Sequence, residues 1–196
     1  MFHDLYDYLY HDAPTGGIPL KGTGIVLGIA LIVSHAWVLM NGDKTKAFLK
    51  AFPRTFKWGV ILMVISLVWA LFLLSNMDMG EFYNMRRIFM LIVAAGAVGM
   101  IMFVPEFLAV RALGCLMLLA ASPVLYAAFM QPQTSRLLLP ILAYAWIIAG
   151  MYFIGMPFLM RDGITWLTAK PGRWNAAVYG GIGYGVLLLA TAIVSY

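Results

Sequence analysis

The sequence predicts an all-α polytopic membrane protein, with six transmembrane helices and a short N-terminal amphipathic helix. Of its 196 residues, 63% are hydrophobic and 11% are charged, whereas a soluble domain carries about 25% charged residues. Several uncharged runs approach or exceed the ~20 residues that a helix needs to cross the hydrocarbon core. The basic residues lie in the gaps between these runs, so the net charge of +5 indicates topology rather than a nucleic-acid partner. We treat residues 1–196 as a single transmembrane domain.

The N-terminal segment MFHDLYDYLYHD has neither the basic start nor the continuous apolar core of a signal peptide. On a helix its apolar side chains share one face and its polar ones another: Phe2, Leu5, Tyr6 and Leu9 against Asp4, Asp7 and His11. We expect a short helix resting on the outer membrane surface. His3 and His11 would lie about 12 Å apart along its axis, too far to share one metal ion, so no metal site is predicted.

The first four spans follow from the apolar runs and one reversal. Two runs, at about 24–40 and 58–74, are separated by KTKAFLKAFPRTFKW, whose lysines and aromatic residues suit a helix lying on anionic headgroups. Residues 88–130 would form a helix about 65 Å long, twice the bilayer, so this run must fold back. Pro105 disfavours helical geometry at Val104 and suits a first helical turn. The reversal therefore lies at VPEF, between spans of about 88–104 and 106–129.

The last two spans are predicted at about 137–160 and 176–194, and the basic residues orient all six. Lys and Arg are concentrated in the first–second and fifth–sixth connections: Lys44, Lys46, Lys50, Arg54 and Lys57, then Arg161, Lys170 and Arg173. The N-terminus is acidic instead. We expect a multi-pass protein of a prokaryotic inner (plasma) membrane, with both termini on the non-cytoplasmic side and the VPEF turn on the cytoplasmic side.

Glu106 and Arg111 are the charges that interrupt the long apolar run. In one helix they would point about 140° apart, so they do not form an i, i+4 pair. The simpler interpretation is an acid at a helix start, favoured by the helix dipole, and a base that extends to the interface. In the other interpretation Arg111 faces a protein neighbour or an anionic ligand, since intramembrane charges usually face inward. Both residues are candidate partner or ligand contacts.

His35 is the only histidine within a predicted span. A neutral imidazole there needs a hydrogen-bond partner on a neighbouring helix or in water. Two further interpretations stay open, namely proton handling and axial ligation of a tetrapyrrole with Trp37 nearby. A haem held by two histidines within one chain is not expected, because the spans hold no second histidine, but a chlorin magnesium needs only one ligand. His35 is therefore the candidate cofactor-binding residue, and the sequence identifies no particular cofactor.

Small residues at helix-packing spacing are abundant. Gly24 and Gly28 have GxxxG spacing, as do Gly181 and Gly185 within YGGIGYG, and such faces let helix backbones approach closely. Some of them must serve packing within the bundle. Because a glycine run on a terminal helix also suits docking to another membrane protein, Gly181 and Gly185 are candidate partner contacts.

The chain shows no GxSxG, HExxH, Walker or CxxC pattern, and we predict no enzyme. The favoured hypothesis is a non-catalytic integral membrane subunit or scaffold of a larger membrane complex, acting through helix–helix packing. Its partners would be membrane lipids and other integral membrane subunits. One alternative is a small carrier or channel with Arg111 and Glu106 near its cytoplasmic mouth. The other is a chlorin- or haem-binding subunit that uses His35.

Overall fold

The computed structural model describes residues 2–11 and 16–196 and confirms the all-α membrane bundle. Six helices are long and apolar enough to cross a membrane: α2 (Leu20–Met40), α4 (Phe56–Asn76), α5 (Arg86–Phe103), α6 (Leu108–Ala128), α7 (Leu138–Gly155) and α9 (Pro171–Val194). Three shorter α-helices are α1 (Phe2–Tyr10), α3 (Gly42–Ala51) and α8 (Phe158–Thr168). Short 3₁₀ turns precede α4, α5 and α7: η2 (Phe52–Arg54), η3 (Gly80–Met85) and η4 (Thr134–Leu137).

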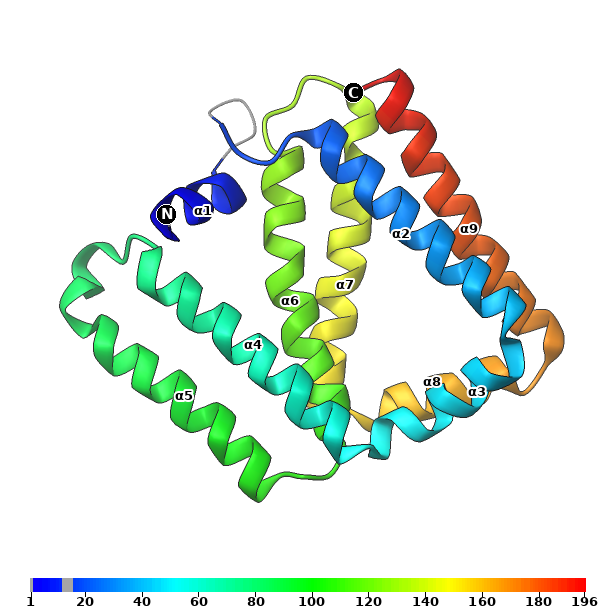
Figure 1. Cartoon of the computed structure of the whole chain (residues 1–196), viewed down its shortest axis with the longest axis horizontal. Helices are drawn as coiled ribbons and strands as arrows, with labels where there is room; N and C mark the ends of the chain where they lie inside the picture. The colour runs from blue at the N-terminus through cyan, green and yellow to red at the C-terminus, as the bar shows by residue number, and fades with distance from the viewer. Residues whose placement is uncertain (1, 12–15) are drawn as a thin grey trace.

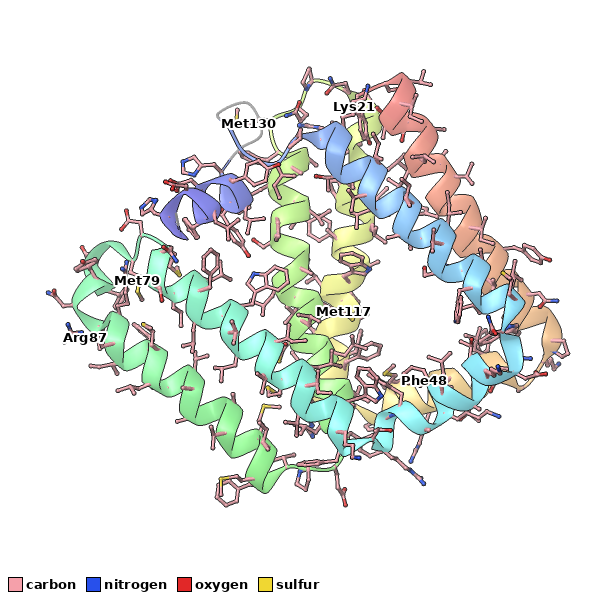
Figure 2. All side chains as sticks on the ribbon, in the orientation of Figure 1. Lys21, Phe48, Met79, Arg87, Met117 and Met130 are labelled. Atoms are coloured by element: carbon pink, nitrogen blue, oxygen red, sulfur yellow. The ribbon has the colours of Figure 1, made fainter. Side chains whose placement is uncertain are left out.

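The spanning helices form three packed pairs, α4–α5, α6–α7 and α2–α9. In Figure 1 the α6–α7 pair stands at the centre, and the other two pairs lean away from it in opposite directions. Helices α3 and α8 contact each other and lie across one end of the bundle, while α1 lies at the other end (Figure 1). Figure 2 shows Arg87 and Met79 at the end of the α4–α5 pair nearest α1, and Phe48 on α3 at the opposite side.

Two apolar cores hold the pairs together, and α6 contributes to both. One core joins α6 and α7 to α2 and α9 through buried side chains that are mostly small or branched: Leu20, Ala121, Val124, Ala128, Leu139, Ala143 and Leu188. The other joins α4, α5 and α6 through Met63, Ala97, Leu108 and Ala112. Because α6 presents alanine and glycine on several faces, neighbouring helices approach it from different sides.

The reversal at VPEF is confirmed, but the predicted start of the fourth span is wrong. Helix α6 begins at Leu108, so Pro105 and Glu106 lie in a turn and not in a first helical turn. Phe107 adopts a left-handed backbone conformation with φ 56°, which costs a non-glycine residue about 1–2 kcal/mol. The Leu108 N–H donates to the Pro105 carbonyl at 3.3 Å. The turn at 104–107 reverses the chain between α5 and α6 (Figure 1).

The fifth span is also shorter than predicted. Helix α7 ends at Gly155 rather than at residue 160, and the chain turns at Met156 into α8, which the sequence analysis did not anticipate. Pro157 explains the break, since it lacks an N–H for the helical ladder and restricts the residue before it. Met156 accordingly leaves the helical region, with φ −130° and ψ 68°. The second, third and fourth spans otherwise lie within two residues of their predicted bounds. Helix α9 begins earlier than expected, with Pro171 in its first turn.

Candidate functional site

Glycines bring α2 and α9 into backbone contact. A Cβ built on Gly28 would lie 3.0 Å from the Gly185 carbonyl oxygen, and one built on Gly185 would lie 3.0 Å from the Gly28 carbonyl oxygen. Gly24 is equally close to Ala192. The spacing predicted to pack helices therefore does so here, and Gly185 is occupied within the chain.

His35 lies in the same interface, against Gly181. A Cβ on Gly181 would collide with the His35 ring, whose Nε2 is the nearest atom. The ring's Nδ1 lies 2.8 Å from the Leu31 carbonyl oxygen. Because a carbonyl oxygen only accepts, Nδ1 is the donor, and in the neutral imidazole the lone pair is then on Nε2. The fold thus brings together the two predicted site residues: the His35 ring occupies the space that a side chain at position 181 would need.

Glu106 lies at the end of the bundle near α3 and α8, in a groove of 580 Å³ lined by Arg54, Phe56, Pro105, Phe107 and Arg161. A neighbouring groove of 280 Å³ shares Arg54 and Arg161 and adds Lys50 and Thr165. Arg161 is already paired with Asp162, its Nε and Nη2 each lying 2.9 Å from Oδ1. The result is an exposed surface of mixed charge in which bases outnumber acids.

Arg111 does not share this groove with Glu106. It stands in the first turn of α6, and its Nε is buried without a hydrogen-bond partner. Its guanidinium makes no ion pair or hydrogen bond within the described ranges. Arg86 provides a contrast, because its two terminal nitrogens donate to the carbonyls of Ser75 and Met77 at 2.9 and 2.7 Å. Arg111 is therefore a half-buried cation that no described residue neutralises.

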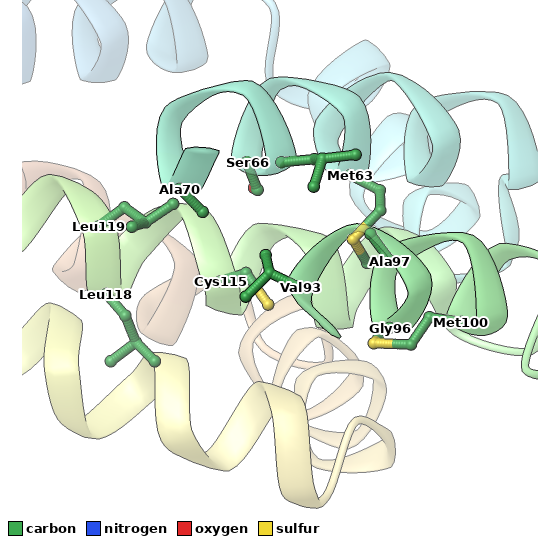
Figure 3. Close-up of a pocket in the computed structure, with 11 residues that line it drawn as sticks. Met63, Ser66, Ala70, Val93, Gly96, Ala97, Met100, Cys115, Leu118 and Leu119 are labelled. Carbon is green, nitrogen blue, oxygen red and sulfur yellow. The ribbon is translucent and has the colours of Figure 1, made fainter. Parts of the chain in front are cut away.

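An apolar cavity of 370 Å³ lies between α4, α5 and α6 (Figure 3). Its walls are aliphatic or small except for a hydroxyl and a thiol: Met63, Ser66, Leu67, Ala70, Val93, Gly96, Ala97, Met100, Cys115, Leu118 and Leu119. This cavity was not predicted from the sequence. The available signal was the run of small residues around Gly96, which leaves space beside α5 where a larger residue would have filled it.

A second missed feature is the aromatic cluster that holds α1 in place. The Trp69 indole N–H donates to the Tyr10 hydroxyl at 2.6 Å. Tyr10 stacks on Tyr6 and packs edge-on against Tyr126. Burial raises the pKa of the Tyr10 hydroxyl above its usual value, and the Trp69 hydrogen bond only partly offsets this. Helix α1 is therefore docked on α4 and α6 through its tyrosines.

The exposed side of α5 is open. We define the α5 outer face as Leu91, Ala95, Val98, Gly99 and Met102, which share one side of the helix at i, i+4, i+7, i+8 and i+11. Leu91 and Met102 are 69% and 67% exposed, and a Cβ on Gly99 would meet nothing within 4 Å. Close-packing chemistry is therefore present on this face without a neighbour among the described residues.

Known proteins add nothing to this geometry, because no protein-family model, curated protein or solved structure matches the chain.

Within residues 2–11 and 16–196, no three His, Cys, Asp or Glu side chains are grouped so as to hold a metal ion. His3 and His11 both approach Asp7 on α1, at 2.8 and 3.6 Å, and all three are exposed enough to reach water. The features that could serve a function are therefore the glycine-mediated helix packing, the unpaired Arg111 and the apolar cavity.

Proposed function

We propose that this chain is a non-catalytic integral membrane subunit that docks to another membrane protein through the α5 outer face. The proposal rests on a contrast between small residues that a neighbouring helix covers and small residues that nothing in the chain's described part covers. Gly114 and Gly28 are covered by a neighbouring helix, whereas Gly99 has nothing near it. Since small residues in membrane helices serve close backbone approach, an uncovered one on an exposed helix suits a partner's helix.

The position of α5 in the bundle supports this role. Only 6% of an 18-residue stretch of the α5 span is buried inside the chain, against 44% for α6. Its packing on other spanning helices is chiefly with α4. A second set of small residues, Gly180 and Gly183, is likewise open on α9, on the far side of the bundle, and would offer a second contact.

The proposed location is a prokaryotic inner membrane with α3, α8 and the 104–107 turn at the cytoplasmic face. The support is the positive-inside rule, because the two basic connections form α3, η2 and α8 at one end of the bundle. Reporter fusions after α3 and after α9 would test it. We expect cytoplasmic activity only from the former, and the reverse pattern would invert the orientation.

The docking proposal is tested by extracting the chain from its native membrane in a mild detergent and measuring the mass of the intact assembly. We expect a mass above that of the monomer. The variant Gly99→Leu should lower recovery of the partner about tenfold, since it fills the contact, while Gly96→Leu on the same helix but facing the cavity should not. A monodisperse monomer with no co-purified membrane protein, or an unchanged assembly in Gly99→Leu, would exclude the proposal.

The cofactor alternative rests on the contact between the His35 Nδ1 and the Leu31 carbonyl, which in the neutral imidazole leaves a lone pair on Nε2. That nitrogen lies against Gly181, so a metal could reach it only if α9 moved away. An absorption spectrum from 350 to 900 nm of protein taken from its native membrane tests it directly. A band that disappears in His35→Ala would establish a bound tetrapyrrole. A spectrum with only the protein envelope would remove His35 as a ligand.

A further inference from the structure

We propose that the cavity between α4, α5 and α6, together with Arg111, binds one anionic phospholipid from the leaflet beside the 104–107 turn. One hydrocarbon chain occupies the cavity, and the phosphate lies on the Arg111 guanidinium. This inference does not depend on the docking role proposed for the α5 outer face.

The lining of the cavity selects hydrocarbon over water. Its one hydroxyl, on Ser66, already donates to the Ala112 carbonyl at 3.3 Å, and the Cys115 thiol is a weak hydrogen-bonding group. A buried water needs two to four polar partners, which these walls do not offer. The volume of 370 Å³ is at the lower end of the ~300–1,000 Å³ of ligand pockets, and it suits a single flexible chain.

Glycine keeps the cavity open on the α5 side. Gly96 lines the cavity, and a Cβ built on it would meet nothing within 4 Å. Helix α5 is also the least buried of the six spanning helices, so the cavity borders lipid rather than a closed interior. A hydrocarbon chain can therefore enter sideways from the bilayer, without passing through a polar surface.

Helical spacing places Arg111 at one end of this cavity. Arg111, Cys115 and Leu118 stand at i, i+4 and i+7 on α6 and so share one side of the helix, and the latter two line the cavity. Side chains of a helix lean toward its N-terminus. The Arg111 guanidinium therefore extends away from Cys115, toward the 104–107 turn and the membrane interface, where a phospholipid carries its phosphate.

The charge of Arg111 has no counterpart in the described chain. Its Nε is buried and unpartnered, and Glu106 lies in the separate groove with Arg54 and Arg161. An unpaired cation at this depth is unfavourable. A phosphate would neutralise the charge of Arg111, because guanidinium binds phosphate through two parallel hydrogen bonds. An apolar chain joined to an anionic head matches both halves of the site.

The test uses purified protein equilibrated with vesicles of phosphatidylcholine alone or of phosphatidylcholine with phosphatidylglycerol, followed by native mass measurement of retained lipid. We expect one retained phosphatidylglycerol. Arg111→Ala should reduce its retention about tenfold, and Gly96→Leu should do the same by filling the cavity. Arg87→Ala, at an exposed arginine of α5, and Gly99→Leu are the matched controls and should leave retention unchanged.

A second measurement uses the unmodified chain and so does not depend on variants that fold. Cys115 is the only cysteine, and it lies within the cavity. Phosphatidylglycerol should slow its reaction with N-ethylmaleimide severalfold relative to phosphatidylcholine alone. Equal retention of the two lipids, unchanged retention in Arg111→Ala, or equal Cys115 reactivity in both vesicles would overturn the proposal. Loss of partner in Gly99→Leu with normal lipid retention would separate this site from the docking face.

Discussion

Helices α5 and α6 are neighbours in the chain and are both apolar enough to span a membrane, yet they have opposite environments. Helix α6 is the most buried spanning helix, and α5 is the least. Both contain glycine and alanine. In α6 these are covered: a Cβ on Gly114 would lie 2.7 Å from the Gly150 carbonyl oxygen. In α5 Gly96 and Gly99 face open space. Hydropathy thus distinguishes membrane from water, whereas the surroundings of each glycine distinguish internal packing from a surface left for something else.

The largest effect we predict is for Gly114→Leu. Four side-chain carbons would have to enter a helix contact that has no room for a Cβ, so the free energy of unfolding in detergent should fall by about 3 kcal/mol. Thermal unfolding of the purified monomer measures this. Gly99→Leu is the control and should cause no loss, because a Cβ at this position meets nothing within 4 Å. Equal losses at both positions would erase the distinction between covered and open glycines.

A smaller effect is expected for Gly181→Ala, since the atom it meets is on the His35 side chain rather than on backbone. The ring can shift, and the loss should be about 1 kcal/mol. In a His35→Ala background most of that loss should disappear, which a double-mutant cycle measures as a coupling. If the stability losses of Gly181→Ala and His35→Ala were strictly additive, the His35 ring and Gly181 would not interact.

Trp69→Phe should act locally, on α1 rather than on the six spans. It removes the hydrogen bond to the Tyr10 hydroxyl, which we expect to lower the stability of the docked α1 by about 1 kcal/mol. Faster amide exchange in residues 2–11 reports the effect. Trp37→Phe, at a tryptophan that is 65% exposed, should leave that exchange unchanged. Unaltered exchange in Trp69→Phe would show that the tyrosine contacts alone hold α1.

The smallest effect, and one of opposite sign, is expected for Gly99→Ala. The position is open, so only the backbone preference of alanine for helix counts, and the isolated monomer should gain about 0.5 kcal/mol. The midpoint of thermal unfolding measures it. A loss larger than 1 kcal/mol would place Gly99 in an interface within the monomer and would contradict its assignment to the α5 outer face.

Much of the fold follows from local physics and was predictable. Six apolar runs, the reversal forced by the length of residues 88–130, and the amphipathic N-terminal helix all depend on the chain's own hydropathy and on proline. The errors are local too. Pro157 ends α7 and starts α8, although it had been placed within a span. The turn at 104–107, with Phe107 in the left-handed region, leaves Glu106 outside the helix.

The candidate site was much less predictable, because it depends on which helices meet. Gly181 and Gly185 have a packing signature, but the sequence does not say that α2 lies opposite them. Arg111 was singled out as a costly charge, whereas the cavity that begins at Cys115, one turn further along α6, depends on Val93, Leu118 and Ala70 converging from three helices. Nothing in the sequence distinguishes Tyr10 from its neighbours, and only the fold brings Trp69 to its hydroxyl. Spacing along one helix predicts a face but not what covers that face.

The pairing of α2 with α9 has a consequence for biogenesis. Four spanning helices separate the two in the chain, and translation proceeds from α2 onward. The surface around Gly24 and Gly28 on α2 therefore stays exposed to lipid while α4 to α7 are synthesised and inserted. Until α9 is synthesised, the growing chain exposes a surface that an insertase or a membrane protease can recognise, and only α9 covers it.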